Sequence, residues 1–323
     1  MFRHAHRSLE HAQLAAHASL LWDEMAGQLP HVEQPLLARI GALHTMPNRN
    51  DLAPLEQSLA ATERDYEVLT TGSLAQRWPG LWIEPPIALL DPRGGRIEAA
   101  AAIRALRDDL ADDIVFGRID EVAPDGAEVR LRTGSVTLTA RSVVVCAGLD
   151  TPQLVKPAGI GIQMDRPLAA TRLTFRPLAG ETPDIPCIHE RGGSLPETIS
   201  YLFPGEWGGV SIGLPSLPEM LTQSLLRRIE GVLTHALPGA EWVREAEVAA
   251  RVEVLDDADH DRIEVHRAGQ VWAVAGWNLF KHAPAVGEGI AALLAGQPAP
   301  LLERLPGERS GDLAAADARR TSG

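Results

Sequence analysis

The sequence predicts an α+β fold that combines a parallel-type sheet with an antiparallel sheet. Residues 141–147 (Arg-Ser-Val-Val-Val-Cys-Ala) form an apolar run without polar alternation, which is typical of a central strand buried on both faces of a parallel sheet. Residues 168–176 and 199–214 predict antiparallel strands instead. No internal repeat is present, so the two parts are expected to be interleaved along one chain of 323 residues.

The first third of the chain predicts helices alternating with short strands. Residues 8–28 predict a helix, because leucines recur near one face, Ser8 can cap its start and Gly27 stands at its end. A strand is expected at 36–46. The other elements expected here are helices at 51–61, 71–77 and 98–110 and a short strand at 87–90.

The remainder predicts strands separated by turn residues. Turns at Pro124-Asp-Gly126 and Thr133-Gly134 separate strands expected at 114–122, 128–132 and 135–138. The later elements expected are helices at 221–237 and 285–294, the second opening at Pro284, and strands at 248–254, 262–265 and 271–275. The tail, residues 301–323, is rich in Gly, Ala, Asp and Arg after Pro306 and is expected to be disordered.

Composition excludes several functional classes. The formal net charge of −13 makes a nucleic-acid partner a poor expectation, because phosphate binding needs a basic patch. The two cysteines, Cys146 and Cys187, lie far apart in the sequence, which argues against a disulfide scaffold and suits a reducing cytoplasm. No run approaches the ~18 apolar residues of a membrane span, and the start lacks the apolar region of a secretory signal. A cytoplasmic protein without a membrane partner is expected.

Two strands that end in glycine carry the most informative pattern. The first is Val143-Val-Val-Cys-Ala-Gly148. The second is Val271-Trp-Ala-Val-Ala-Gly276, which leads through Trp277-Asn-Leu-Phe-Lys281 towards a helix. A strand that feeds a helix N-terminus presents backbone N–H groups and the positive end of a helix dipole to an anion or a polar ring edge. Each run is also compatible with a plain buried strand, with Lys281 as a solvated loop residue.

Five segments in the same order resemble the superfamily of FAD-dependent amino-acid and amine oxidoreductases that contains D-amino acid oxidase, glycine oxidase and sarcosine oxidase. The nearest pattern is that of monomeric sarcosine oxidase and N-methyl-tryptophan oxidase. The segments are Arg3-His-Ala with the helix ending Leu-Trp22-Asp-Glu, Leu74-Ala-Gln-Arg-Trp-Pro79-Gly, Val144-Val-Cys-Ala-Gly148, Tyr201-Leu-Phe-Pro204, and the loop from Gly276 to Gly287.

The resemblance implies a site for a small amine or amino acid beside non-covalently bound FAD. Arg3 and Lys281 would grip the substrate carboxylate, and Tyr201 would shape the pocket. As plain residues, Arg3 would be a solvated terminal residue and Tyr201 a core tyrosine. The residues expected to lie against FAD are Val115, Ala147, Gly148, Gly276, Trp277, Asn278, Leu279, Phe280 and Lys281.

Several positions depart from the family pattern. The lysine that helps reduced flavin react with oxygen in sarcosine oxidase falls at Ser211, and a nearby active-site histidine falls near Pro215. The cysteine that carries FAD covalently falls near Arg251, so no covalent attachment is expected. These departures leave room for a dehydrogenase or an inactive relative.

The family's strand-Gly-x-Gly-x-x-Gly-helix unit, which holds the FAD pyrophosphate, has no counterpart in this sequence. Three explanations compete: a true start upstream of Met1, a separate polypeptide that supplies the unit, or a remnant that binds no FAD. The first is favoured, because Arg3-His-Ala retains functional-looking residues.

The resemblance therefore predicts an N-terminally truncated, Rossmann-like FAD domain from residues 1–40, 85–160 and 260–300, and an antiparallel-sheet substrate domain from 41–84 and 161–259. The expected enzyme oxidises a C–N bond of a small amino acid or N-alkyl amino acid by hydride transfer to flavin N5. The alternative is a non-catalytic or split subunit that needs a partner chain with the Gly-x-Gly-x-x-Gly unit.

No metal site is expected. His4, His6, His11 and His17 cluster near the N-terminus without a metal-binding pattern, and they are interpreted as surface histidines. The acidic run Asp256–Asp261 lacks the central glycine and closing glutamate of an EF-hand, and a solvated turn is expected there.

Overall fold

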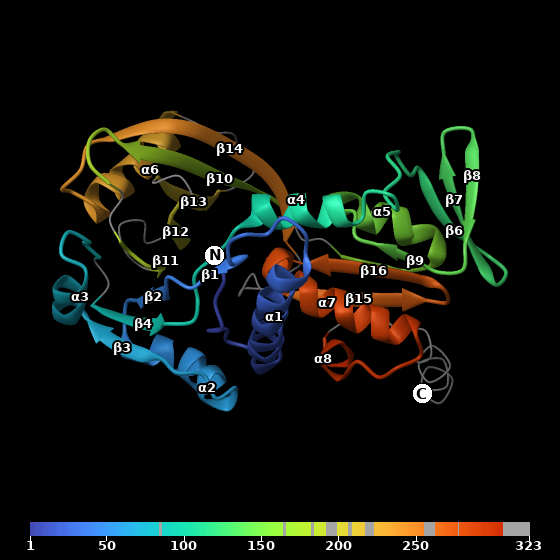
Figure 1. Cartoon of the computed structure of the whole chain (residues 1–323), viewed down its shortest axis with the longest axis horizontal. Coiled ribbons are helices and arrows are strands. Elements are labelled where there is room, and N and C mark those ends of the chain that lie inside the picture. Colours follow the sequence, from blue (N-terminus) through green and yellow to red (C-terminus); the bar gives the residue numbers. More distant parts are fainter. Residues whose placement is uncertain are drawn as a thin grey trace, which may run out of the picture. The chain divides into compact units, whose positions relative to one another are not determined.

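The computed structural model describes residues 1–83, 86–163, 166–181, 184–191, 199–205, 209–216, 223–254, 262–276 and 278–305. The chain forms two compact units (Figure 1). Unit 1 comprises Met1–Asp109 and Pro167–Val252, and unit 2 comprises Leu110–Arg166 and Glu253–Gly323. Of the tail expected to be disordered at 301–323, residues 301–303 belong instead to the short helix α8 (Pro300–Glu303). Residues 306–323 and the acidic run Asp256–Asp261 lie outside the described residues.

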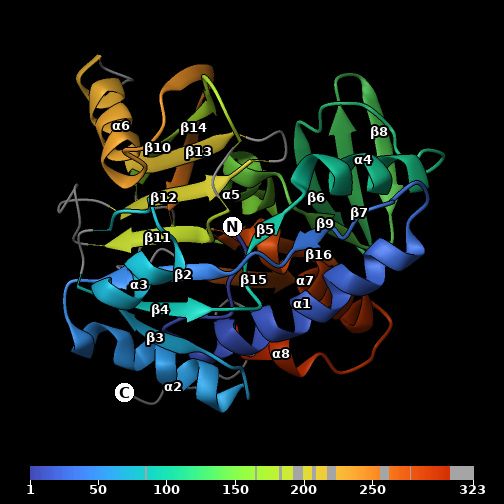
Figure 2. The ribbon, with the colours of Figure 1, turned by 60° about the vertical axis from the view of Figure 1, so that its left-hand side comes forward.

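Unit 1 is built on an eight-stranded sheet with the strand order β14-β10-β13-β12-β11-β2-β4-β3 (Figure 2). The strands are β2 (Ala42–Met46), β3 (Glu67–Thr70), β4 (Ile87–Asp91), β10 (Arg166–Pro177), β11 (Cys187–Arg191), β12 (Ile199–Pro204), β13 (Val210–Ser216) and β14 (Trp242–Val254). β2 and β11 pair in parallel, whereas β3–β4, β2–β4, β11–β12, β12–β13 and β10–β13 are antiparallel. The antiparallel-rich sheet and the mixed helices confirm the α+β prediction.

The two faces of this sheet differ because successive side chains of a strand alternate between them. One face carries a row of buried apolar partners from six neighbouring strands: Leu90, Leu43, Ile188, Leu202, Ile212 and Leu173. Helix α6 (Gln223–Ala236) covers that face, and its Ile229 and Leu233 belong to the same core cluster (Figure 1). The neighbouring residue of each strand therefore projects from the opposite face.

The N-terminal half of unit 1 supplies helices and two short strands. Its elements are α1 (Leu9–Gln28), β1 (Leu37–Ala38), the 3-10 helix η1 (Arg49–Leu52), α2 (Ala53–Ala61), α3 (Thr71–Arg77), β5 (Arg96–Ile97) and α4 (Ala99–Asp109). The Ser8 hydroxyl accepts from the His11 N–H, as the predicted cap of α1 requires. Leu55 and Leu59 of α2 pack with Leu89 of β4, on the face of the sheet opposite α6.

Unit 2 contains two three-stranded sheets, β15-β16-β9 and β6-β7-β8. The strands are β6 (Glu121–Asp125), β7 (Glu128–Thr133), β8 (Val136–Ala140), β9 (Val143–Val145), β15 (Ile263–Ala268) and β16 (Val271–Gly276). β16 pairs antiparallel with β15 and parallel with β9. The helical elements are η2 (Gly148–Asp150), α5 (Thr151–Val155), η3 (Lys156–Ala158), α7 (Leu279–Leu294) and α8 (Pro300–Glu303).

Three predicted elements need correction. The strand expected at 36–46 is divided into β1 and β2, because Gly41 adopts φ +86° between them. Of the strand expected at 114–122, only the part from Glu121 onward is a strand; residues 114–120 are irregular. The last long helix begins at Leu279 rather than near Pro284, which lies inside it.

Burial explains the early start of α7. Lys281 and His282 of its first turns are buried, so packing stabilises a turn that Pro284, lacking an N–H donor, does not favour locally. Strand β14 is also longer than the predicted 248–254, and β3, β11 and α5 had no counterpart in the prediction. These elements are short or lack clear periodicity, so long-range pairing decides them.

The compact units group the segments differently from the predicted domains. Residues 1–40 and 85–109 lie in unit 1 with 41–84, whereas they were expected to accompany 260–300. The assignment of cofactor and substrate roles to parts of the chain stays a prediction. No helix within the described ranges is long and apolar enough to cross a membrane.

Candidate functional site

The face of the unit 1 sheet opposite α6 carries a row of five residues, here called the polar row. His44 of β2 pairs with His189 of β11, His189 with Tyr201 of β12, Tyr201 with Gly213 of β13, and Gly213 with Arg172 of β10. Direct partners in a sheet project to the same face. The alternation that buries the apolar row under α6 therefore places two imidazoles, a phenol and a guanidinium together on the opposite face.

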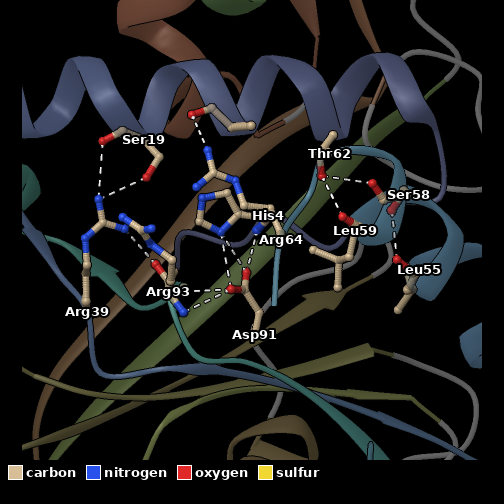
Figure 3. Close-up of polar contacts among 12 residues, drawn as sticks. His4, Ser19, Arg39, Leu55, Ser58, Leu59, Thr62, Arg64, Asp91 and Arg93 are labelled. Atoms are coloured by element: carbon tan, nitrogen blue, oxygen red, sulfur yellow. Dashed lines mark hydrogen bonds and ion pairs between the residues drawn. The ribbon is translucent and has the colours of Figure 1, made fainter. Parts of the chain in front are cut away.

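The N-terminal segment, residues 2–6, is held at this sheet by backbone and side-chain hydrogen bonds. Phe2 forms an isolated antiparallel bridge with Gly95, with its N–H 2.7 Å from the Gly95 oxygen. The His4 N–H donates to Asp91 Oδ2 at 2.7 Å, and its Nδ1 lies 3.0 Å from the same oxygen (Figure 3). Asp91 closes β4 and also accepts from the N–H groups of Arg93 and Gly94 at 3.1 and 3.0 Å. One buried carboxylate thus ties the N-terminal segment to the sheet.

Asp91 remains ionised despite its burial. Burial by itself raises the pKa of this carboxyl, but the hydrogen bonds and positive charge of His4 outweigh that effect, so the pKa lies below the usual range for an aspartate. Arg39 adds a second tie, because its Nη1 donates to the Arg93 oxygen and its Nη2 to Ser19 Oγ of α1 (Figure 3). The same Nη2 also donates to Asp23 of α1. These contacts position residues 2–6, and Arg3 among them.

Arg3 reaches the polar row through His189. Arg3 Nη1 lies 3.4 Å from His189 Nδ1, and the same Nδ1 lies 3.3 Å from His44 Nδ1. A guanidinium can only donate hydrogen bonds, so His189 Nδ1 acts as the acceptor for both neighbours. His189 is then the neutral imidazole protonated at Nε2, and His44 donates from Nδ1.

Tyr201 stacks on His189, with ring centroids 4.8 Å apart and planes inclined by 25°. His189 therefore contacts both Arg3 and Tyr201, two residues that the resemblance assigns to the substrate site. Arg3 is only 7% exposed, which excludes the alternative of a solvated terminal residue, and Tyr201 is half-buried rather than enclosed in the core. His44 and His189 are buried, and exposure rises along the polar row towards Arg172.

Ser211 lies on the same face as Tyr201, because it is two residues from Gly213 along β13. It is buried, and its Oγ lies 3.0 Å from Thr174 Oγ1 of β10. In the resemblance to sarcosine oxidase, a lysine aligns with Ser211. This chain instead has a hydroxyl there, which is hydrogen-bonded to the Thr174 hydroxyl. The positive charge that a lysine would bring to this position is therefore absent.

In unit 2, the two glycine-ended strands meet at one edge. β9 and β16 are parallel neighbours with Val145 opposite Ala273, so Gly148 and Gly276 both follow the carboxyl ends of their strands. Gly148 has φ +58° and nothing within 4 Å of the position where a Cβ would lie. An open glycine beyond paired parallel strands is the arrangement at which open α/β sheets bind ligands, and its bare backbone fits the close approach of a flat ring.

The residues after Gly276 form the start of a helix. Asn278 has φ +58° and precedes α7, which places Leu279, Phe280 and Lys281 in the first turn. Lys281 is 5% exposed, so it is not a solvated loop lysine. Phe280 is exposed, and Ala147 donates its N–H to Thr151 Oγ1 at 2.9 Å. Trp277 lies outside the described residues.

Val115 is 88% exposed and lies in the irregular segment before β6, not in a strand. The structure thus brings Arg3 together with Tyr201 in unit 1, and Gly148 together with Gly276 in unit 2. Their roles, and those of Val115 and Lys281, stay predictions.

The N-terminal histidines were wrongly interpreted as surface residues. His4, His6 and His11 are buried, because the N-terminal segment is held against the sheet and α1. No group of three possible metal ligands occurs among the described residues.

Sequence reasoning missed His44 and His189. His44 interrupts the apolar run Ile40-Gly-Ala-Leu-His44, and a polar residue inside a predicted strand was the available signal. His189 lies in β11, which the sequence did not predict as a strand.

Comparison with known proteins places these features in a context. The family model described as DAO, FAD dependent oxidoreductase, matches residues 1–293. Human peroxisomal sarcosine oxidase is 32% identical over 133 residues, which are 40% of this chain and 33% of that protein. The match thus spans about a third of that relative's length.

Two solved structures share the fold. Glycine oxidase from Geobacillus kaustophilus superposes with a TM-score of 0.73 at 17% identity, covering 88% of this chain and 79% of that one. L-proline dehydrogenase from P. horikoshii gives a TM-score of 0.76 at 14% identity, covering 93% and 83%. At these identities the likeness concerns the fold alone.

Proposed function

We propose, from the premise that this chain belongs to the family of FAD dependent oxidoreductases, that it oxidises a C–N bond of a small amino acid or N-alkyl amino acid. The observation that carries the proposal is the contact of His189 with both Arg3 and Tyr201. His189 thereby has a guanidinium at its Nδ1 and a phenol ring stacked on its imidazole. The guanidinium can bind a carboxylate in two parallel hydrogen bonds, and the ring can line the pocket for the remainder of the substrate.

When bound, FAD would supply the two-electron oxidant: a hydride would pass from the carbon next to nitrogen to flavin N5, leaving an imine that water hydrolyses. The chain's own residues bind and orient. Gly148, beyond the carboxyl end of β9, would offer bare backbone against the cofactor, and Ala147 and residues 276–281 would line it. The resemblance, rather than the structure, assigns Lys281 the role of a second positive charge for the substrate carboxylate.

Ser211 favours an electron acceptor other than oxygen. In the resemblance, the lysine at this position assists the reaction of reduced flavin with oxygen. Here the Ser211 hydroxyl is bound to Thr174 and brings no charge. We therefore infer a dehydrogenase rather than an oxidase.

The test is a comparison of wild-type protein with an Arg3→Gln variant. FAD-loaded protein is offered a panel of amino acids and N-methyl amino acids with an artificial electron acceptor, and imine hydrolysis is followed as carbonyl product. We expect turnover that depends on the substrate carboxylate and weakens in the variant. Protein that neither shows flavin absorbance nor is reconstituted with FAD would contradict the proposal.

A second candidate is a split flavoprotein, in which another polypeptide supplies the strand-Gly-x-Gly-x-x-Gly-helix unit. Among the described residues β9 pairs with β16 on one edge only, and Val143 and Val144 are partly exposed. The other edge offers backbone donors and acceptors to a further strand. This candidate predicts that a co-expressed chain with the glycine motif co-purifies and restores FAD binding; independent FAD binding would contradict it.

A further inference from the structure

The polar row continues past the candidate site to a second arginine. Tyr201 pairs with Gly213, and Gly213 pairs with Arg172. The next residue of β10, Leu173, is fully buried in the core under α6. Because side chains alternate along a strand, Arg172 projects from the same face as Tyr201 and His189.

The face opens in the direction of Arg172. His189 is 2% exposed, Tyr201 is half-buried and Arg172 is exposed. The position between Tyr201 and Arg172 is Gly213, which has no side chain to fill the space. A small molecule that binds at Arg3 and lies over Tyr201 would therefore extend across Gly213 towards Arg172.

Arg172 is available to an anion. Its side chain makes no hydrogen bond or ion pair with any residue in the described part of the chain. Arg176 offers a contrast, because it lies on the same face of the same strand but donates to Glu245 Oε1 at 2.6 Å.

The spacing suits a molecule with two acid groups. Neighbouring strands lie about 4.8 Å apart, so the backbone of Arg172 is about 14 Å from that of His189, three strands away. His189 contacts the Arg3 guanidinium. The long side chain of Arg172 can reach back along this separation. The space that remains between the guanidinium groups of Arg172 and Arg3 then suits a small dicarboxylate.

We propose that the substrate is an amino acid with a second carboxylate, either an acidic amino acid or an N-carboxyalkyl amino acid. Arg3 binds the carboxylate next to the reacting carbon, and Arg172 binds the distal one. This inference rests on the proposed function of Arg3 and adds a specificity-determining residue to that site.

Calorimetric binding to FAD-loaded protein tests the proposal with two ligands of equal chain length, glutarate and pentanoate. Wild-type protein should bind glutarate about two- to fivefold more tightly, as an added ion pair near the surface allows. Arg172→Gln should abolish that preference and leave pentanoate binding unchanged, and Arg172→Lys should restore part of it. Arg176→Gln, the matched control, should keep the full preference.

The outcomes separate the two proposals. Equal affinity of wild-type protein for the two ligands, or an unchanged preference in Arg172→Gln, overturns the role of Arg172. Unchanged pentanoate binding in Arg3→Gln overturns the carboxylate site itself. In turnover, Arg172→Gln should raise KM for acidic amino acids with little change in kcat, whereas KM for neutral amino acids should stay constant.

Discussion

Arg3 owes its place to a chain of single-residue contacts. Asp91 holds His4, the backbone brings the adjacent Arg3 to His189, and His189 in turn stacks on Tyr201. His189 Nδ1 accepts from Arg3, and this contact helps to define the orientation of the guanidinium. Two predictions follow from individual side chains.

Replacing Arg3 by Gln removes the charge from the carboxylate site. A hydrogen bond to a charged group contributes about 1.5–3 kcal/mol, so KM for the preferred amino acid should rise about 10- to 100-fold. Steady-state kinetics with the artificial acceptor measures it. Arg7→Gln, at an exposed position four residues along, is the control and should leave KM unchanged.

Replacing Ser211 by Lys should give reduced enzyme a new reactivity with oxygen. A cation near the reduced flavin favours electron transfer to oxygen, and the resemblance places this position beside it. Stopped-flow reoxidation of the reduced protein should accelerate by about tenfold or more, which equals a barrier lower by about 1.4 kcal/mol. Ser211→Met has similar bulk without charge; acceleration in both variants would show that the lysine charge is not responsible.

At the scale of elements, the sheet of unit 1 places residues from separate segments on one face. The β9–β16 pair of unit 2 places the ends of two separate segments at one edge. The N-terminal segment is an added layer, and its attachment depends on Asp91 at the end of β4. Two further predictions concern these elements.

Asp91→Asn should destabilise the attachment of residues 2–6. The buried carboxylate accepts several hydrogen bonds, and weakening them costs about 1–3 kcal/mol at pH 7. Because the pKa of folded Asp91 is lowered, its contribution is present above the unfolded pKa of about 3.9 and is lost as pH falls through the folded pKa.

Thermal unfolding of wild type and Asp91→Asn over a pH series measures this contribution. The difference in Tm should be largest near neutral pH and should shrink below about pH 4. Asp23→Asn breaks an exposed ion pair with Arg39 and serves as the control with a small effect. A difference that grows towards acid would contradict the assigned direction.

Gly148→Ala should weaken FAD binding beyond its effect on stability. Gly269, in the turn between β15 and β16, has φ +59° and equally open surroundings, compared with +58° at Gly148. Alanine at either position costs about 1–2 kcal/mol of backbone strain. Fluorescence titration should show a raised Kd for FAD only in Gly148→Ala; equal changes in both variants would argue against a cofactor at Gly148.

At the scale of the whole molecule, the proposed function requires that FAD binds the folded chain, in keeping with a family of FAD dependent oxidoreductases. A ligand that binds only the folded state stabilises it by about 2.7 kcal/mol at one hundred times its Kd. Hydrogen exchange measures where this stabilisation acts.

We expect FAD to protect the amides of residues 143–148 and 271–281, at the carboxyl ends of β9 and β16, more than those of the β6–β8 sheet. Protection spread evenly over unit 2, or confined to residues 121–140, would contradict the placement of the cofactor at the glycine edge.

Local sequence was sufficient for elements whose information lies within a few residues. Ser8 and the leucine spacing defined α1, the turn residues separated β6, β7 and β8, and β16 ends at Gly276 as predicted, whereas β9 already ends at Val145, before Gly148. These features depend on contacts between near neighbours in the chain. The same local motifs, read as a resemblance, also led to the family.

Only the tertiary structure decided which side chains share a face. His44, His189 and Arg172 come from three distant segments, and the local sequence around each of them does not predict the polar row. Their common face follows from strand register, which the packing of alternate residues under α6 determines. In the same way, burial of Lys281 and His282 extended α7 past Pro284, because the free energy of packing exceeded the local preference of proline.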